Sequence, residues 1–170
     1  MKQTILVTGG TGFIGSHTTV ELQQAGYDVV IVDNLSNSKI EVLDGIEKIT
    51  GIRPAFEQVD LRDYDATEAV FKKYPQICGI IHFAASSQVG ESMVDPLKYY
   101  NNNLCGTEVL LECMVAHGID KIVFSSTAAT YGEPESIPIL ETDRTEPTNC
   151  YGETKLSMEK MFKWTSKAHN

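Results

Sequence analysis

Short runs of β-branched and aliphatic residues alternate along the chain with longer amphipathic stretches. The runs predicted to be strands are residues 4–8, 28–33, 55–60, 79–83 and 122–125. The first of these, Thr4–Thr8, lacks the apolar–polar alternation of a half-exposed strand. A run of this kind is typical of a strand buried on both faces, as in a parallel sheet.

The amphipathic stretches predict helices between the strands. These helices are expected over residues 12–25, 38–50, 64–74, 96–117 and 148–169. Gly26 and Gly118 follow two of them as stop signals, and Pro96 stands where a helix begins. Residues 127–147 contain Gly132 and three prolines, which indicates a loop.

Regular strand–helix alternation predicts an α/β fold, a doubly wound parallel sheet of the Rossmann type. Right-handed crossovers give an expected strand order of 3-2-1-4-5. We expect residues 1–170 to form one incomplete dinucleotide-binding domain, because the sequence ends on a helix where a sixth strand would normally follow. The sequence therefore predicts part of a longer protein, truncated before a substrate domain.

Net charge and composition disfavour several classes of binding partner and site for this protein. The net charge of −9 disfavours nucleic acid or an anionic membrane, since both select basic surfaces. No run approaches the length of a membrane helix, and the N-terminus lacks a signal-peptide pattern, so we expect a cytoplasmic protein. The four cysteines show no metal-ligand spacing, so we expect most of them to be buried thiols, with no disulfide and no metal.

A glycine-rich turn between the first strand and the first helix carries the clearest chemistry. Gly9, Gly12 and Gly15 have the spacing G-x-x-G-x-x-G. Gly10, Gly12 and Gly15 have the spacing G-x-G-x-x-G. Such a turn lets the backbone approach a pyrophosphate at a helix N-terminus. Asp33 ends the second strand, where a carboxylate is expected to bind the ribose hydroxyls and to repel a 2′-phosphate. These features favour NAD over NADP; the alternative is a structural turn beside a surface aspartate.

Tyr151 and Lys155 are four residues apart and share one face of the last predicted helix. A nearby ammonium favours a phenolate, which allows a tyrosine to act as a base at neutral pH. The alternative is a surface tyrosine beside a solvated lysine. Hydroxyl side chains at Ser125–Thr127 end the fifth strand at the ligand-binding edge of the sheet. We interpret His82 as an edge or core residue and not as a catalytic one.

Several segments resemble the extended short-chain dehydrogenase/reductase family, and within it the UDP-glucose 4-epimerases. They are VTGGTGFIGSH, VDNLSNS, VDLRD, IIHFAA, VGES, PLKYYNNN, FSSTAATYGEP and YGETK. They extend from residue 5 to about residue 160 and correspond to about the first half of the family's length. The resemblance implies an isomerase of galactose metabolism that uses NAD and a UDP-sugar and assembles as a homodimer.

The resemblance also implies residue roles. Thr127, Tyr151 and Lys155 would form the catalytic set, and Thr127 and Tyr151 would contact the sugar. Tyr151, Lys155 and the glycines Gly9, Gly12 and Gly15 would bind NAD. The other residues implied to bind NAD are Phe13, Ile14, Asp33, Asn34, Asn37, Ser38, Asp60, Leu61, Phe83, Ala84, Ala85, Ser87 and Asn102. Ser87 stands where many members have lysine, and Thr127 replaces a serine but keeps the hydroxyl.

The implied mechanism begins when Tyr151 takes the proton of the sugar 4-hydroxyl while hydride passes from C4 to NAD. The 4-keto sugar then rotates within the site and receives the hydride on its other face. A 4,6-dehydratase is disfavoured because Ala128 and Ala129 stand where that enzyme needs an acid/base pair. Epimerases of uronic acids or N-acetylated sugars stay open, as does a non-catalytic NAD-binding module, and we expect 170 residues alone to be inactive.

Overall fold

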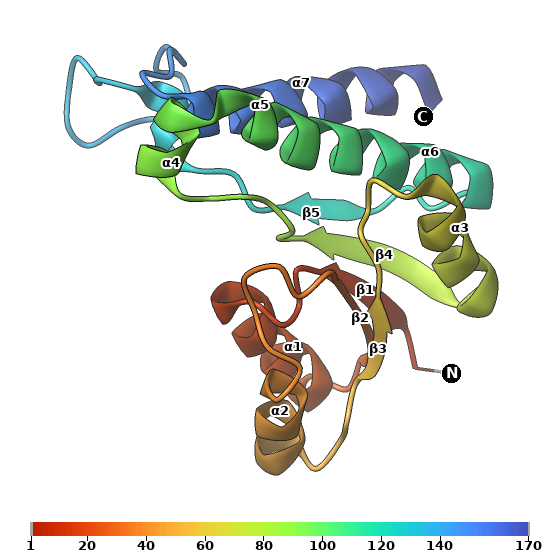
Figure 1. The fold of residues 1–170 in the computed structure, drawn as a ribbon. Helices are drawn as coiled ribbons and strands as arrows, with labels where there is room; N and C mark the ends of the chain where they lie inside the picture. Colours follow the sequence, from red (N-terminus) through yellow and green to blue (C-terminus); the bar gives the residue numbers. More distant parts are fainter. Residues whose placement is uncertain (1, 170) are drawn as a thin grey trace. The chain divides into compact units, whose positions relative to one another are not determined.

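The computed structural model describes residues 2–169 and contains a parallel sheet with helices on both faces (Figure 1). The strands are β1 (Thr4–Thr8), β2 (Asp28–Asp33), β3 (Ala55–Gln58), β4 (Ile77–His82) and β5 (Ile122–Phe124). Their order is β3-β2-β1-β4-β5, and every neighbouring pair is parallel. The predicted Rossmann-type α/β fold and strand order are confirmed.

Helices connect the strands in the expected alternation. They are α1 (Phe13–Gln24), α2 (Val42–Thr50), α3 (Tyr64–Lys73), α4 (Val89–Val94), α5 (Pro96–Tyr99), η1 (Tyr100–Cys105), α6 (Gly106–His117), η2 (Ala128–Tyr131) and α7 (Cys150–His169). Asp63 caps α3 and Asp95 caps α5, each accepting a hydrogen bond from a first-turn N–H. Such caps explain where these helices begin.

Apart from shifted ends, such as α2 beginning at Val42 instead of residue 38 and β3 ending at Gln58 instead of residue 60, three details differ from the sequence-based predictions. The single helix expected over residues 96–117 is divided, because η1 is π-helical and separates α5 from α6. The short helix α4 was not predicted, and a turn of 3₁₀-helix, η2, lies in the segment predicted to be a loop. Hydrophobic periodicity does not encode π or 3₁₀ geometry, which depends on backbone hydrogen bonding over single turns.

Two compact units are distinguished within the chain. The first contains the chain up to Ala84 together with Glu112–Ser125, and the second contains Ala85–Leu111 and the chain from Ser126 onward. The sheet with α1, α2 and α3 belongs to the first unit, and α4, α5, η1, η2 and α7 belong to the second. The single-domain boundary expected from the sequence stays a prediction.

The core of the first unit follows from the strict alternation of side chains along buried strands. Val7 of β1 and Val29 and Ile31 of β2 pack with Leu43 and Ile46 of α2 in one cluster. Figure 1 shows α1 and α2 on this face of the sheet and α3 on the other. Both faces of β1 and β2 are therefore covered, which explains their continuous apolar sequence.

Candidate functional site

The glycine turn lies at the carboxyl end of β1 and brings two chain segments into close contact. Gly9 has a φ of 69°, a left-handed conformation that favours glycine, and its N–H donates to the Val32 carbonyl at 2.8 Å. A Cβ at Gly9 would stand 2.7 Å from the backbone nitrogen of Ala84. This turn, which we call the cradle, therefore needs glycine at position 9 so that it can lie against the Ala84 backbone.

Helix α1 begins at the end of this cradle with Gly12 as its N-cap. Its first two residues, Phe13 and Ile14, are 82% and 58% exposed, although both are large and apolar. No acidic side chain lies in the first turn of α1. An N-terminus of this kind offers backbone N–H groups and a positive dipole end to an anion.

The Asp33 carboxylate joins the glycine turn to the loop that follows β2. Its side chain is 8% exposed. Oδ2 accepts the Thr11 N–H at 3.2 Å, and Oδ1 accepts the Leu35 N–H at 2.9 Å and the Ser38 hydroxyl at 3.0 Å. Thr11 and Ser38 also share a hydroxyl hydrogen bond of 2.8 Å. The predicted residues Asp33 and Ser38 are therefore in direct contact, and the sequence analysis missed Thr11.

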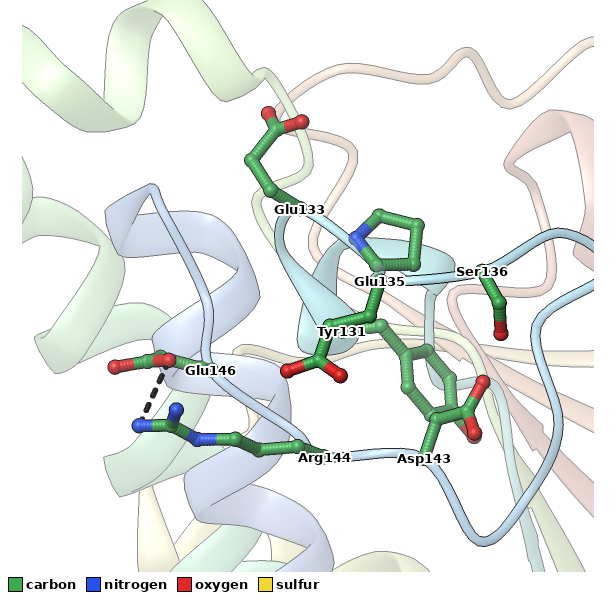
Figure 2. A pocket seen from close by; sticks show the side chains of 8 residues that line it. Tyr131, Glu133, Glu135, Ser136, Asp143, Arg144 and Glu146 are labelled. Carbon is green, nitrogen blue, oxygen red and sulfur yellow. Dashed lines mark ion pairs between the residues drawn. The ribbon is translucent and has the colours of Figure 1, made fainter.

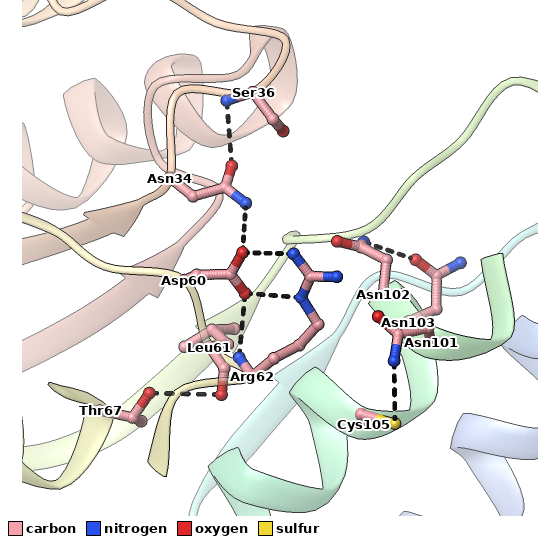
Figure 3. A network of polar contacts seen from close by, with 10 residues as sticks. All are labelled: Asn34, Ser36, Asp60, Leu61, Arg62, Thr67, Asn101, Asn102, Asn103 and Cys105. Carbon is pink, nitrogen blue, oxygen red and sulfur yellow. Dashed lines mark hydrogen bonds and ion pairs between the residues drawn. The ribbon is translucent and has the colours of Figure 1, made fainter. Parts of the chain in front are cut away.

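Asp60 lies after β3 and forms a second polar cluster, drawn in Figure 3 with Asn34 and Arg62. The Arg62 guanidinium donates to both carboxylate oxygens of Asp60, at 2.9 and 2.6 Å, and the Asn34 amide donates at 3.3 Å. The hydrogen bonds from Arg62 hold the pKa of Asp60 down, to about 2, although partial burial opposes this shift. Leu61 follows with a buried side chain, and Asn37 of the predicted set is exposed.

A buried polar pair supports the turn from the neighbouring strand. The Thr8 hydroxyl and Nδ1 of His82 lie 2.6 Å apart, and the His82 ring stacks on Phe124 with 5.9 Å between centroids. His82 is 1% exposed, so its interpretation as a core residue agrees with its burial. Phe83 and Ala84 follow β4 directly, and the Ala84 N–H donates to the Thr8 hydroxyl at 3.4 Å, which links this pair to the segment that lies against Gly9.

In the second unit the predicted residues Ala85 and Ser87 flank Ser86, and both Ser86 and the predicted residue Asn102 contact Asn103, which was not predicted. The Asn103 side chain is 1% exposed. It accepts the Ser86 N–H at 2.8 Å, donates to the Ser86 carbonyl at 3.1 Å and donates to the Thr154 hydroxyl at 3.0 Å. Asn102 donates to Asn103 at 3.0 Å, within the π-helical segment (Figure 3). The run of three asparagines, residues 101–103, indicated a polar site. The run did not show that Asn103 is the residue that joins Ser86 to Thr154.

Helix α7 carries Tyr151 and Lys155 on consecutive turns, as predicted. Asn149 caps the helix by accepting the Gly152 N–H at 2.8 Å, and the Tyr151 N–H donates to the Ser92 hydroxyl at 3.1 Å. Lys155 is 3% exposed, and this burial lowers its pKa to about 8. The half-buried Tyr151 and the buried Lys155 do not fit a solvated surface pair.

Thr127 lies at the N-cap of η2, where its hydroxyl accepts the Ala129 N–H at 3.2 Å. The backbone next to it packs closely on α7, because a Cβ at Gly152 would stand 2.5 Å from the Ala129 carbonyl oxygen. Ser126 donates a hydrogen bond to Glu159 on the same helix. The second unit therefore holds Thr127, Tyr151 and Lys155 on two elements in contact.

A separate hollow of about 160 Å³ lies in the segment between η2 and α7 (Figure 2). Its charged lining is mainly acidic, and Arg144 pairs with Glu146 there at 2.9 Å. None of the predicted NAD-binding or catalytic residues is among its lining residues. We assign no ligand to this hollow.

Several classes of site are absent from residues 2–169. In this range no group of three His, Cys, Asp or Glu side chains is arranged to hold a metal ion. No helix in the same range has both the length and the apolar character needed to cross a membrane. The cysteines Cys78, Cys105, Cys113 and Cys150 are free thiols; only Cys113 is buried, so the expectation that most would be buried was wrong.

Comparisons with known proteins agree with this arrangement. Residues 5–170 match the model of the NAD dependent epimerase/dehydratase family. A UDP-glucose 4-epimerase of Lacticaseibacillus casei is 54% identical over 166 residues, which cover 98% of this chain and 48% of the relative. The chain thus spans about half the length of the curated relatives it matches.

Solved structures show the same likeness. The UDP-glucose-4-epimerase of Stenotrophomonas maltophila with bound NAD and formylated UDP-arabinopyranose is 42% identical with a TM-score of 0.95, covering 99% of this chain and 50% of that one. The UDP-glucose 4-epimerase of Bifidobacterium longum in complex with NAD+ and UDP is 45% identical with a TM-score of 0.94, covering 97% and 49%. The predicted cofactor, NAD, is the one crystallised with these neighbours.

Proposed function

Because the chain belongs to the NAD dependent epimerase/dehydratase family, we propose that it is the cofactor-binding and catalytic half of an NAD-dependent UDP-glucose 4-epimerase. The observation that supports this most is Lys155, a buried lysine one turn after Tyr151 on α7. Lysine is seldom fully buried, and titratable groups whose pKa is strongly shifted cluster at functional sites. The names of the most similar relatives supply the substrate class.

The residues of the first unit are proposed to bind the adenosine and pyrophosphate end of NAD. The cradle at Gly9, Gly12 and Gly15 fits a pyrophosphate, and Phe13 and Ile14 begin the helix whose N–H groups would bind it. The buried Asp33 carboxylate would accept the ribose hydroxyls, with Asn34, Asn37 and Ser38 beside it. The residues proposed to line the rest of the cofactor are Asp60, Leu61, Phe83, Ala84, Ala85, Ser87 and Asn102.

The chemistry is proposed for the three residues held by the second unit. Tyr151 would remove the proton from the sugar 4-hydroxyl, and Thr127 would position that proton for transfer. Lys155 would favour the phenolate form of Tyr151 and would bind the nicotinamide ribose. The chemistry supplied by NAD when bound is reversible acceptance of hydride from sugar C4. Return of hydride to the other face of the 4-keto sugar would interconvert UDP-glucose and UDP-galactose.

The competing reactions differ in the residues they need. A 4,6-dehydratase needs an acid/base pair after Thr127, and Ala128 and Ala129 supply neither group. Epimerases of N-acetylated sugars occur among the structural neighbours, including one from Methanobrevibacter ruminantium at 33% identity. We favour UDP-glucose because the relatives that are about 50% identical carry that name. Homodimerisation, a cytoplasmic location and a role in galactose metabolism stay predictions.

The test compares Tyr151→Phe with Tyr64→Phe in a protein of the full length of its relatives. Tyr64 lies on α3 in the first unit and is 42% exposed. Conversion of UDP-galactose to UDP-glucose should fall at least about a hundredfold in Tyr151→Phe, the usual contribution of a general base, while NAD stays bound. Tyr64→Phe should keep normal turnover. Full turnover by Tyr151→Phe would refute the proposed base, and vigorous turnover by the 170 residues alone would refute their expected inactivity.

A further inference from the structure

The segment that carries Thr127 is attached to α7 on both sides of that residue. On its C-terminal side, a Cβ at Gly152 would stand 2.5 Å from the Ala129 carbonyl oxygen, so η2 lies directly against the helix backbone. On its N-terminal side, the Ser126 hydroxyl donates to Oε1 of Glu159. Both contacts lie within the second unit. Thr127 is therefore held between two attachment points on one helix.

The two attachment points lie on one face of α7. Gly152 and Glu159 are seven residues apart, which is about two turns and roughly 10 Å along a helix. Lys155 lies between them in the sequence, and Tyr151 directly precedes Gly152. The segment that carries Thr127 thus follows the part of the helix that carries Tyr151 and Lys155.

The two attachments differ in chemistry. The contact at Gly152 is backbone packing and involves no polar side chain. The contact at Glu159 is a hydrogen bond from a hydroxyl to a carboxylate, and it joins positions that are 33 apart in the sequence. Ser126 is exposed and Glu159 is half-buried, so this bond adds little to stability. Its main effect is on the placement of the segment.

The direction of the Thr127 hydroxyl depends on the backbone of this segment. Its oxygen accepts the Ala129 N–H at 3.2 Å, and the Thr127 carbonyl accepts the Thr130 N–H at 3.2 Å and the Thr130 hydroxyl at 2.8 Å. A hydroxyl that accepts one hydrogen bond still has its own hydrogen to donate. Thr127 is extended, with φ of −154° and ψ of 148°, so a shift of Ser126 moves the Thr127 side chain with it.

We propose that Glu159 is a positioning residue, which holds the Thr127 hydroxyl in place for Tyr151 by binding Ser126. This inference rests on the proposed function, in which Thr127 positions the proton that Tyr151 removes. Neither Ser126 nor Glu159 touches the reacting atoms in this role. A displacement of a reacting group by about 1 Å can cost up to about a hundredfold in rate, so the loss of one attachment affects turnover more than stability.

The experiment is a double-mutant cycle in a protein of the full length of its relatives, with conversion of UDP-galactose to UDP-glucose as the readout. Ser126→Ala and Glu159→Met should each lower turnover about tenfold. The double variant should also be about tenfold slower, because the second substitution removes a bond that is already lost. NAD affinity, measured by titration calorimetry, should stay within about twofold in all three variants.

Conservative variants separate the hydrogen bond from the charge of Glu159. Ser126→Thr keeps the donor and Glu159→Gln keeps an acceptor oxygen, so both should retain turnover within about threefold of the wild-type protein. A Glu159→Gln variant as slow as Glu159→Met would overturn the inference, because it would show that Glu159 acts through its charge.

Glu146→Met is the matched control. Glu146 is an exposed carboxylate of the same unit that pairs with Arg144 at 2.9 Å, and its replacement should leave turnover unchanged. Normal turnover by Ser126→Ala or Glu159→Met, or a loss of about a hundredfold in the double variant, would overturn the inference alone. A wild-type protein that binds NAD but does not convert UDP-galactose would overturn the proposed function and this inference with it.

Discussion

A Cβ atom at Gly15 would stand 2.3 Å from the carbonyl oxygen of Gly9, which is well inside any tolerated contact. The next nearest atom, the Cα of Gly10, would lie at 2.9 Å. Both neighbours are backbone, so they cannot move aside without distorting the turn. The close packing of α1 on the end of β1 therefore requires glycine at position 15.

Gly15→Ala should destabilise the protein by about 1–3 kcal/mol, because the added methyl group overpacks a rigid backbone contact. It should also weaken NAD binding, since the helix N-terminus is displaced from the cradle. Thermal unfolding measures the first effect and titration calorimetry with NAD measures the second.

Gly45→Ala is the matched control for that experiment. Gly45 lies inside α2, and a Cβ there would meet no atom within 4 Å. Alanine should stabilise the helix by up to about 1 kcal/mol and leave NAD binding unchanged. Equal effects of the two substitutions would contradict the steric argument.

Lys155→Met should make the fold more stable at neutral pH. Burial lowers the lysine pKa from 10.5 to about 8, so the unfolded chain holds the proton more tightly and the folded state is penalised below about pH 8. A tenfold difference in proton affinity corresponds to about 1.4 kcal/mol, so a fall of the pKa from 10.5 to about 8 predicts a gain of about 3 kcal/mol. The gain should be largest below pH 8 and should shrink as the pH rises from 8 toward 10.5.

Unfolding temperatures of Lys155→Met at pH 7 and pH 9.5 measure this difference. Lys163→Met, at an exposed position of the same helix, should change stability by less than about 0.5 kcal/mol at either pH. A lower unfolding temperature of Lys155→Met would contradict this prediction and would show that Lys155 stabilises the fold. Turnover, by contrast, should be lost in this variant if Lys155 has its proposed role.

Ser92→Ala should disturb the start of α7. The Ser92 hydroxyl is buried, donates to the Val89 carbonyl at 2.7 Å and accepts the Tyr151 N–H. Its removal should cost about 1–2 kcal/mol because it leaves that N–H without its acceptor. Turnover should fall more than NAD affinity, because the substitution acts on the position of Tyr151.

Ser36→Ala, at an exposed position, is the control and should change stability by less than about 0.5 kcal/mol. A fall in NAD affinity as large as the fall in turnover would argue that Ser92 supports the fold of the second unit in general. Steady-state kinetics and calorimetry on the same preparations separate these results.

The strands and their order could be predicted because the signal is local and strong. Runs such as Val29–Val32 are apolar over several residues, and the glycine turn follows β1 at once. The same local signal located Tyr151 and Lys155 on one helix face. The burial of Lys155 could not be predicted, since it depends on the elements that pack around α7.

The missed residues make contacts between segments far apart in the sequence. Asn103 and Thr154 are 51 positions apart, and Thr11 and Asp33 are 22 apart. A hydrophobic pattern describes the face of an element and contains no information on such polar partners. Arg62 is close to Asp60 in sequence, but a single arginine two residues after an aspartate is too common to indicate a bidentate contact.

We propose that the glycine turn and Asp33 bind NAD and reject NADP. The most direct measurement is titration calorimetry of the purified protein with each dinucleotide, with circular dichroism to establish that it is folded. We predict one NAD per chain and at least about tenfold weaker binding of NADP, because the 2′-phosphate would face the Asp33 carboxylate. A folded protein that binds no NAD, or binds NADP as tightly as NAD, would contradict these roles of the glycine turn and Asp33.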